Sequence, residues 1–238
     1  VHGAVLFVGY LAIEPYVRRL WPSVLVSWAR LVSGRVRDPI IGRDILAGSA
    51  LALFGVLVDR FIQYVARSTG LTDQAPSLFP STLMSMFSSS SMLSMFTVSM
   101  AIGLLRAMVF FTLLVILRFV LRNNRAAAVA IVIVFSLVFT NYGSKAIWLE
   151  LPMAFILNTL SLVIVLRFGF VATAMALGAQ TLFSEFPWTT NFSTWSAPQT
   201  LLGWILVLGL VGYGFMTAVG GKSLFKDPLS DPLKHEVR

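Results

Sequence analysis

The chain has 238 residues, of which 57% are apolar and only 12% charged, and its formal net charge is +8. Soluble domains carry about 25% charged residues, so this composition excludes an ordinary soluble domain and predicts an integral membrane protein. There is no cysteine, which excludes disulfides and thiolate sites, and the two histidines lie at opposite ends of the chain, so we expect no metal or cofactor.

The first apolar run, residues 1–13, is too short to cross a bilayer, because a spanning helix needs about 20 residues. We interpret it as the end of a first spanning helix whose beginning is missing, and the chain as the C-terminal part of a longer protein. Pro15 ends this run, because the residue before a proline is pushed out of the helical conformation.

Residues 14–44 form a basic loop with six arginines: Arg18, Arg19, Arg30, Arg35, Arg37 and Arg43. Such loops are retained in the cytoplasm beside anionic lipid, which accounts for the net charge better than nucleic acid does. Within the loop, an apolar face of Val24, Leu25, Trp28, Leu31 and Val32 predicts an amphipathic interfacial helix. Ser27 falls on another face of that helix, and Asp38-Pro39 predicts a turn after it.

The second span is predicted at residues 45–65, where small residues favour close helix contacts. The following outer segment, 67–100, is rich in serine and methionine. Its apolar residues predict one face of an interfacial helix, and a flexible lid over a pocket is the alternative. The residues of that face are Leu83, Met86, Phe87 and Met95.

Five further apolar runs complete a transmembrane domain over residues 1–221, followed by a cytoplasmic tail at 222–238. The runs are 103–121, 126–140, 149–166, 170–183 and 201–219. Together they predict an all-α, multi-pass helical bundle with about seven segments, the first truncated.

The distribution of basic residues orients this bundle. If the 14–44 loop is cytoplasmic, alternation places every lysine and arginine there except Arg60, Arg67, Arg106 and Lys145. That bias is typical of the cytoplasmic side of an inner (plasma) membrane, with the C-terminus also cytoplasmic. Four tryptophans fall on the outer side, as an aromatic belt requires: Trp148, Trp188, Trp195 and Trp204.

Four charged residues are candidates for structural or functional roles. Glu14 and Arg18 are spaced for an ion pair at the base of the first helix. Asp44 opens the second predicted span, where a carboxylate suits the positive end of the helix dipole. Arg106 is the strongest candidate for a functional intramembrane charge, although its place near the outer end of the third span favours snorkelling.

Gly209 and Gly212 share a face of the last span and predict a helix-packing contact, with the fifth or sixth span as the partner. A dimer contact between two chains is the alternative.

No sequence motif assigns catalysis to this chain. G-G-K-S at residues 220–223 lacks the earlier glycine of a phosphate-binding loop, because Met216 stands there. Kinase, serine-hydrolase and H-E-x-x-H motifs are also absent, so we expect no catalytic residue.

Three runs carry a family resemblance. They are L-A-I-E-P-Y-V-R-R-L-W-P-S-V-L-V-S-W-A-R-L-V-S-G-R-V-R-D-P-I-I-G-R-D near the start, F-P-W-T-T-N-F-S-T-W-S-A-P-Q-T-L, and Y-G-F-M-T-A-V-G-G-K-S-L-F near the end. They resemble the membrane region that follows the catalytic domain in a group of bacterial serine/threonine protein kinases. The resemblance implies an upstream kinase domain as a partner and a membrane-anchoring, sensory role for this region. The alternatives are a permease or transporter component and, less favoured, a membrane enzyme.

Overall fold

The computed structural model describes residues 22–71, 88–140, 147–185, 193 and 197–220, and the regular structure in these residues is entirely helical. This confirms the predicted all-α class. The elements are η1 (Pro22–Leu25, a 3₁₀ helix), α2 (Val26–Val32), α3 (Pro39–Ser68), α5 (Ser89–Leu121), α6 (Asn124–Phe139), α7 (Ile147–Phe168), α8 (Phe170–Glu185) and α9 (Ala197–Val219).

Four of these helices are long and apolar enough to cross a membrane: α3, α5, α7 and α9. The shortest, α7, has 22 residues. At 1.5 Å per residue it is about 33 Å long, which matches a hydrocarbon core of about 30 Å. Helices α6 and α8 have 16 residues each and are shorter than the core is thick.

Helix α3 begins earlier than predicted. The Asp38 carboxylate accepts a hydrogen bond from the Ile40 N–H at 2.9 Å, and Pro39 occupies the first helical position. Proline is favoured there because its missing N–H is not needed and its φ suits the helix. The turn predicted at Asp38-Pro39 is therefore the start of the helix, and the boundary at residue 45 was wrong.

Helix α5 also begins earlier than predicted, at Ser89 rather than at residue 103. The Ser88 hydroxyl accepts from the Ser91 N–H, so serine caps this helix instead of separating two. Met92 and Met95 are buried against Leu182 of α8. A separate interfacial helix is thus wrong for residues 89–100. The other residues of its predicted face, at 83, 86 and 87, lie outside the described part.

Close helix packing centres on α8, which lies between α3 and α5. A Cβ added at Gly48 of α3 would clash with the backbone of Ala172. One added at Gly103 of α5 would clash with the backbone of Ala174 and Gly178. Glycine permits these approaches because it carries no side chain, and small residues are the usual basis of helix association in lipid.

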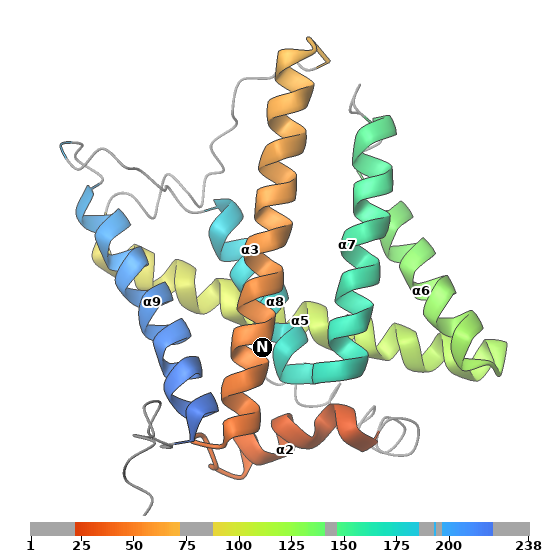
Figure 1. The fold of residues 1–238 in the computed structure, drawn as a ribbon, viewed down its shortest axis with the longest axis horizontal. Coiled ribbons are helices and arrows are strands. Elements are labelled where there is room, and N and C mark those ends of the chain that lie inside the picture. Colours follow the sequence, from red (N-terminus) through yellow and green to blue (C-terminus); the bar gives the residue numbers. More distant parts are fainter. Residues whose placement is uncertain (1–21, 72–87, 141–146, 186–192, 194–196, 221–238) are drawn as a thin grey trace, which may run out of the picture.

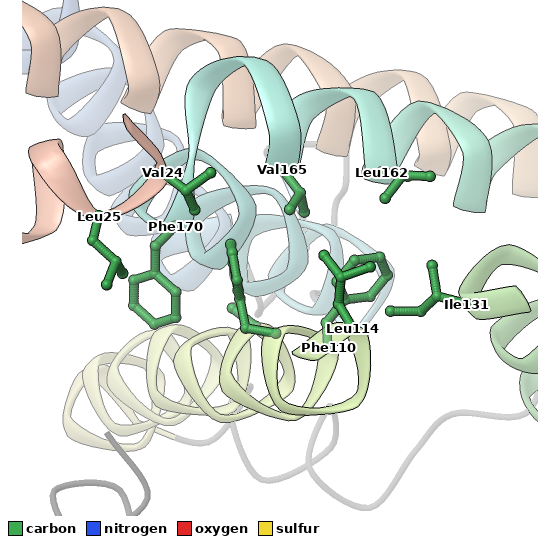
Figure 2. Close-up of a cluster of buried hydrophobic side chains, with 10 residues drawn as sticks. Val24, Leu25, Phe110, Leu114, Ile131, Leu162, Val165 and Phe170 are labelled. Carbon is green, nitrogen blue, oxygen red and sulfur yellow. The ribbon is translucent and has the colours of Figure 1, made fainter. Parts of the chain in front are cut away.

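A buried apolar cluster joins η1, α5, α6, α7 and α8 (Figure 2). Its residues are Val24, Leu25, Ala107, Phe110, Phe111, Leu114, Ile131, Leu162, Val165 and Phe170. Trp28 of α2 packs edge-on against Phe170, with ring centroids 5.0 Å apart. The predicted break between α7 and α8 is confirmed at Gly169, whose φ of +94° favours glycine.

In Figure 1, α3 and α7 stand upright, while α5 runs from side to side across the view and passes behind α3. The 33 residues of α5 make it about 50 Å long, and a helix longer than the bilayer core accommodates by tilting. Helix α2 lies across one end of the molecule. The start of α3, the α5–α6 and α7–α8 junctions and the end of α9 lie toward that same end, which we call the α2 end.

Candidate functional site

Asp44 is enclosed by the protein in the second turn of α3, with none of its surface exposed. Its Oδ1 accepts two hydrogen bonds from Arg43, from Nη2 at 3.0 Å and from Nε at 3.2 Å. The Arg43 side chain is 54% exposed and its guanidinium lies over the Phe168 ring, 5.3 Å from the centroid. Arg43 therefore carries the charge of this pair toward the surface, while Asp44 remains inside.

Ser27 of α2 meets Asp44 at this point. The Ser27 hydroxyl lies beside the Asp44 carboxylate without reaching hydrogen-bonding geometry. Both the hydroxyl oxygen and Asp44 Oδ2 are buried without a hydrogen bond in the described part of the chain. A buried polar atom without a hydrogen-bond partner is costly, so burying these two atoms where α2 packs against α3 lowers stability unless another group satisfies them. Ser27 was predicted on another face of α2 than the apolar residues, and it is buried there, with 2% of its surface exposed.

The dipole role predicted for Asp44 falls to Asp38 instead. Since α3 begins at Pro39, Asp38 is the residue that caps it. The hydrogen bond from the Ile40 N–H lowers the pKa of Asp38, and the Arg30 guanidinium, whose Nη1 lies 2.6 Å from Oδ2, lowers it further. Asp44 instead lies buried where α2 packs against α3.

Arg106 lies near the middle of α5, because the helix extends from Ser89 to Leu121. The prediction that it lies near the end of its helix was wrong, while snorkelling stays a prediction. Its Nη1 donates to Thr181 Oγ1 of α8 at 3.0 Å. The Thr181 hydroxyl donates in turn to the Leu177 carbonyl at 3.0 Å, so it is the acceptor in its contact with Arg106.

The surroundings of Arg106 are apolar and open. Its side chain is exposed, and its neighbours on the helix, Leu105 and Val109, are 40% and 52% exposed. The two ion pairs found among the described residues join Arg30 to Asp38 and Arg43 to Asp44, so neither involves Arg106. An arginine within a long apolar helix is costly on membrane-insertion scales, so Arg106 is a candidate functional residue.

A small cavity between α3, α7 and α8 is lined by two polar side chains, Ser161 and Gln180, and by apolar residues such as Gly55 and Leu157. Its volume of about 20 Å³ is that of about one water molecule. It is too small for an organic ligand, so Arg106 and Asp44 remain the stronger candidates.

The packing contact predicted for Gly209 and Gly212 is wrong for the described residues. A Cβ added at either position would meet nothing within 4 Å, and α9 packs mainly on α3 rather than on α7 or α8. The contact is made instead by the far side of α9, where the Gly214 carbonyl, Thr217 and Ala218 crowd Gly42 of α3. Gly209 and Gly212 leave an open face, which is compatible with the alternative of a dimer contact.

The remaining predicted residues, Glu14 and Arg18, lie outside the described residues. Within the described ranges, no group of three histidine, aspartate or glutamate side chains is arranged to hold a metal. Sequence reasoning missed Thr181 as the hydrogen-bond partner of Arg106 and Ser27 as a neighbour of Asp44, because the surroundings of a small polar residue depend on the neighbouring helix.

Comparison of this chain with family models, with curated proteins and with solved structures finds no match. The class of protein is therefore defined by the fold alone. It is an all-helical chain, in its described part, with four apolar helices of membrane-spanning length, and among the charged residues within them Asp44 is enclosed and Arg106 is exposed.

Proposed function

We propose that this chain is the multi-pass membrane region of a bacterial serine/threonine protein kinase. It anchors an upstream kinase domain to the inner membrane and receives outer signals, without catalytic residues of its own. Seven spanning segments, including the first apolar run and the short helices α6 and α8, complete the proposed topology.

The observation that carries the membrane part of this proposal is the number of arginines in or beside the elements at the α2 end, whose arrangement Figure 1 shows. The described arginines in or beside the elements at that end are Arg30, Arg35, Arg37, Arg43, Arg118, Arg122, Arg125 and Arg167. Arg60 and Arg67 lie near the opposite end of α3. Cytoplasmic ends of membrane proteins are enriched in arginine and lysine, so we assign the α2 end to the cytoplasm.

The kinase part of the proposal is supported by the resemblance of the three sequence runs described above. The first run includes η1, α2 and the start of α3, and the last includes the end of α9. These segments meet at the α2 end, where Gly42 of α3 packs against Gly214 and Thr217 of α9. The segments that carry the resemblance therefore lie together at the α2 end.

Cysteine labelling tests the orientation directly, because the natural chain has no cysteine. Ser33→Cys is exposed after α2, and Ser193→Cys lies before α9. In intact cells, a membrane-impermeant thiol reagent should label Ser193→Cys and leave Ser33→Cys unlabelled until the cells are lysed. The opposite pattern would overturn the assignment.

The kinase link has a separate test. The coding sequence upstream of Val1 should contain a kinase fold with an ATP loop and a catalytic aspartate. The full-length protein should then transfer phosphate from ATP in the membrane fraction, and a truncation that removes residues 1–238 should release that activity into the soluble fraction. A permease half upstream would favour the alternative instead.

That alternative, a permease or transporter component, is favoured by one specific observation. Arg106 is an exposed cation within an apolar helix, and charged residues within membrane-spanning segments often mark substrate pathways. Uptake of labelled phosphate or organic anions into proteoliposomes tests this function. Transport lost in Arg106→Gln would support it over a purely anchoring role.

A further inference from the structure

We infer that Arg106 and Thr181 form a binding site for an anionic phosphate group at the crossing of α5 and α8. The phosphate belongs either to a phospholipid headgroup or to a soluble phosphate compound. The inference rests on the geometry of these two helices and holds whether or not a kinase domain precedes the chain.

The first step is the hydrogen-bonding capacity of Arg106. A guanidinium has five N–H donors, and within the described chain one nitrogen, Nη1, is engaged, by Thr181 Oγ1. The planar arrangement of the other donors matches two oxygens of a phosphate or carboxylate. The side chain thus presents unused donors on an exposed surface.

Thr181 orients the guanidinium of Arg106. Thr181 is buried, with 5% of its surface exposed, and its hydroxyl already donates a hydrogen bond to the Leu177 carbonyl. It therefore offers a lone pair to Arg106 and holds one edge of the guanidinium against α8. Thr181 is a positioning residue, because it reaches the ligand only through Arg106.

The positive charge of Arg106 is not neutralised by an acidic side chain within the described part of the chain. Asp38 and Asp44 are each paired with another arginine, at the α2 end of α3. No acid among the described residues pairs with Arg106. We therefore expect an anion from outside this part of the chain to neutralise the charge of Arg106.

The fourth step is the character of the surrounding surface. Leu105 and Val109 flank Arg106 on α5, and Val98 lies two turns earlier on the same exposed side at 51% exposure. A cation set in an apolar surface suits a ligand with a charged head and an apolar body, which is the chemistry of a phospholipid. A small phosphate compound would use the same guanidinium without the apolar contacts.

The experiment uses the full chain in nanodiscs. In one arm, discs of phosphatidylcholine receive increasing fractions of phosphatidylglycerol, and native mass spectrometry counts the anionic lipids retained. In the other arm, phosphatidylcholine discs are titrated with inorganic phosphate, and the melting temperature is followed. The variants are Arg106→Gln, Arg106→Lys and Thr181→Val, with Arg60→Gln as the matched control.

Arg60 is a suitable control because it is also exposed and also bonded to α8, through the Ser184 carbonyl. We expect Arg106→Gln to weaken anion binding at least tenfold, Thr181→Val to weaken it less, and Arg60→Gln to leave it unchanged. Arg106→Lys should retain part of the binding, since it keeps the charge but loses the planar donor set.

The two arms distinguish the sources. Loss of retained phosphatidylglycerol alone identifies a lipid headgroup, and loss of the phosphate-induced rise in melting temperature alone identifies a soluble ligand. Circular dichroism checks that each variant is folded, and Thr181→Val serves as the second probe if Arg106→Gln is not. If both the Arg106 and Thr181 variants bind like the natural chain in both arms, the site does not exist.

Discussion

Asp44 and Arg106 are both charged residues within apolar helices, yet their surroundings differ completely. Asp44 is fully enclosed where α2 meets α3, beside Ser27 and paired with Arg43. Arg106 is exposed where α5 crosses α8, and a threonine hydroxyl is its hydrogen-bond partner. The difference indicates that one charge joins parts of the protein, whereas the other is available to something outside it.

Packing explains why the two regions differ. Near Asp44, close contacts at Gly42 and Gly48 bring α9 and α8 against α3 on two sides, which leaves no room for a ligand. Near Arg106, Gly103 brings α8 against one side of α5, and the adjoining side is open. The glycines thus determine where neighbouring helices approach closely. This packing in turn determines which charged side chain is enclosed and which is exposed.

The largest expected effect comes from adding a methyl group where α5 and α8 approach most closely. Gly103→Ala would place a Cβ against the backbone of Ala174 and Gly178, which has no flexible end to move aside. We expect a loss of about 3 kcal/mol in the free energy of unfolding, at the upper end of the usual overpacking range, or failure to fold. Thermal denaturation in detergent measures it.

Gly209→Ala is the matched control, since the added Cβ meets open space on α9. Alanine has the higher helix propensity, so stability should stay the same or rise by up to about 1 kcal/mol. Equal losses in the two variants would contradict the packing described here. A change of oligomeric state in the Gly209 variant alone would instead indicate a dimer contact on that face.

The next effect concerns the enclosed charge. Asp44→Asn keeps the shape of the side chain but removes the charge that binds Arg43, and we expect a loss of about 1–2 kcal/mol. The loss is smaller than for a fully buried pair, because the half-exposed Arg43 can turn toward water. Chemical denaturation of Asp44→Asn, Arg43→Gln and the double variant gives the coupling energy. A coupling near zero would show that Arg43 does not stabilise the enclosed carboxylate.

The sequence predicted the type and the approximate place of every described long helix, because uninterrupted apolar runs have few alternatives in a membrane protein. It also predicted the break at Gly169 and the concentration of arginines toward one end. These properties depend on local composition. The seven-segment count and the kinase partner stay predictions.

Helix ends and contacts were harder to predict, for physical reasons. Asp38-Pro39 and the serines before residue 100 are typical of turns and of helix starts alike, and only the hydrogen bonds decide between them. That ambiguity misplaced Arg106 near a helix end. Likewise, Gly209 and Gly103 look equivalent in the sequence, and the crossing of neighbouring helices determines which one is packed.

The smallest expected effect is the pH dependence of the α3 cap, which lies at the same end as Asp44 but outside the apolar part of the helix. The Ile40 N–H and Arg30 lower the pKa of Asp38 in the folded chain below its ordinary value of about 3.9. A lowered folded-state pKa means that the carboxylate stabilises the fold above the ordinary value, and that this contribution is lost as the pH falls through the folded-state pKa.

Asp38→Asn isolates this contribution, because asparagine still caps a helix but does not titrate in this range. The melting temperature of the natural chain should exceed that of the variant by a small, constant amount at neutral pH. The difference should shrink below pH of about 3.9 and disappear at lower pH. Arg30→Gln should reduce the neutral-pH difference without abolishing it, because the Ile40 N–H remains. A difference that grows on acidification would have the wrong sign and would show that Asp38 is not stabilised as a carboxylate in the folded chain.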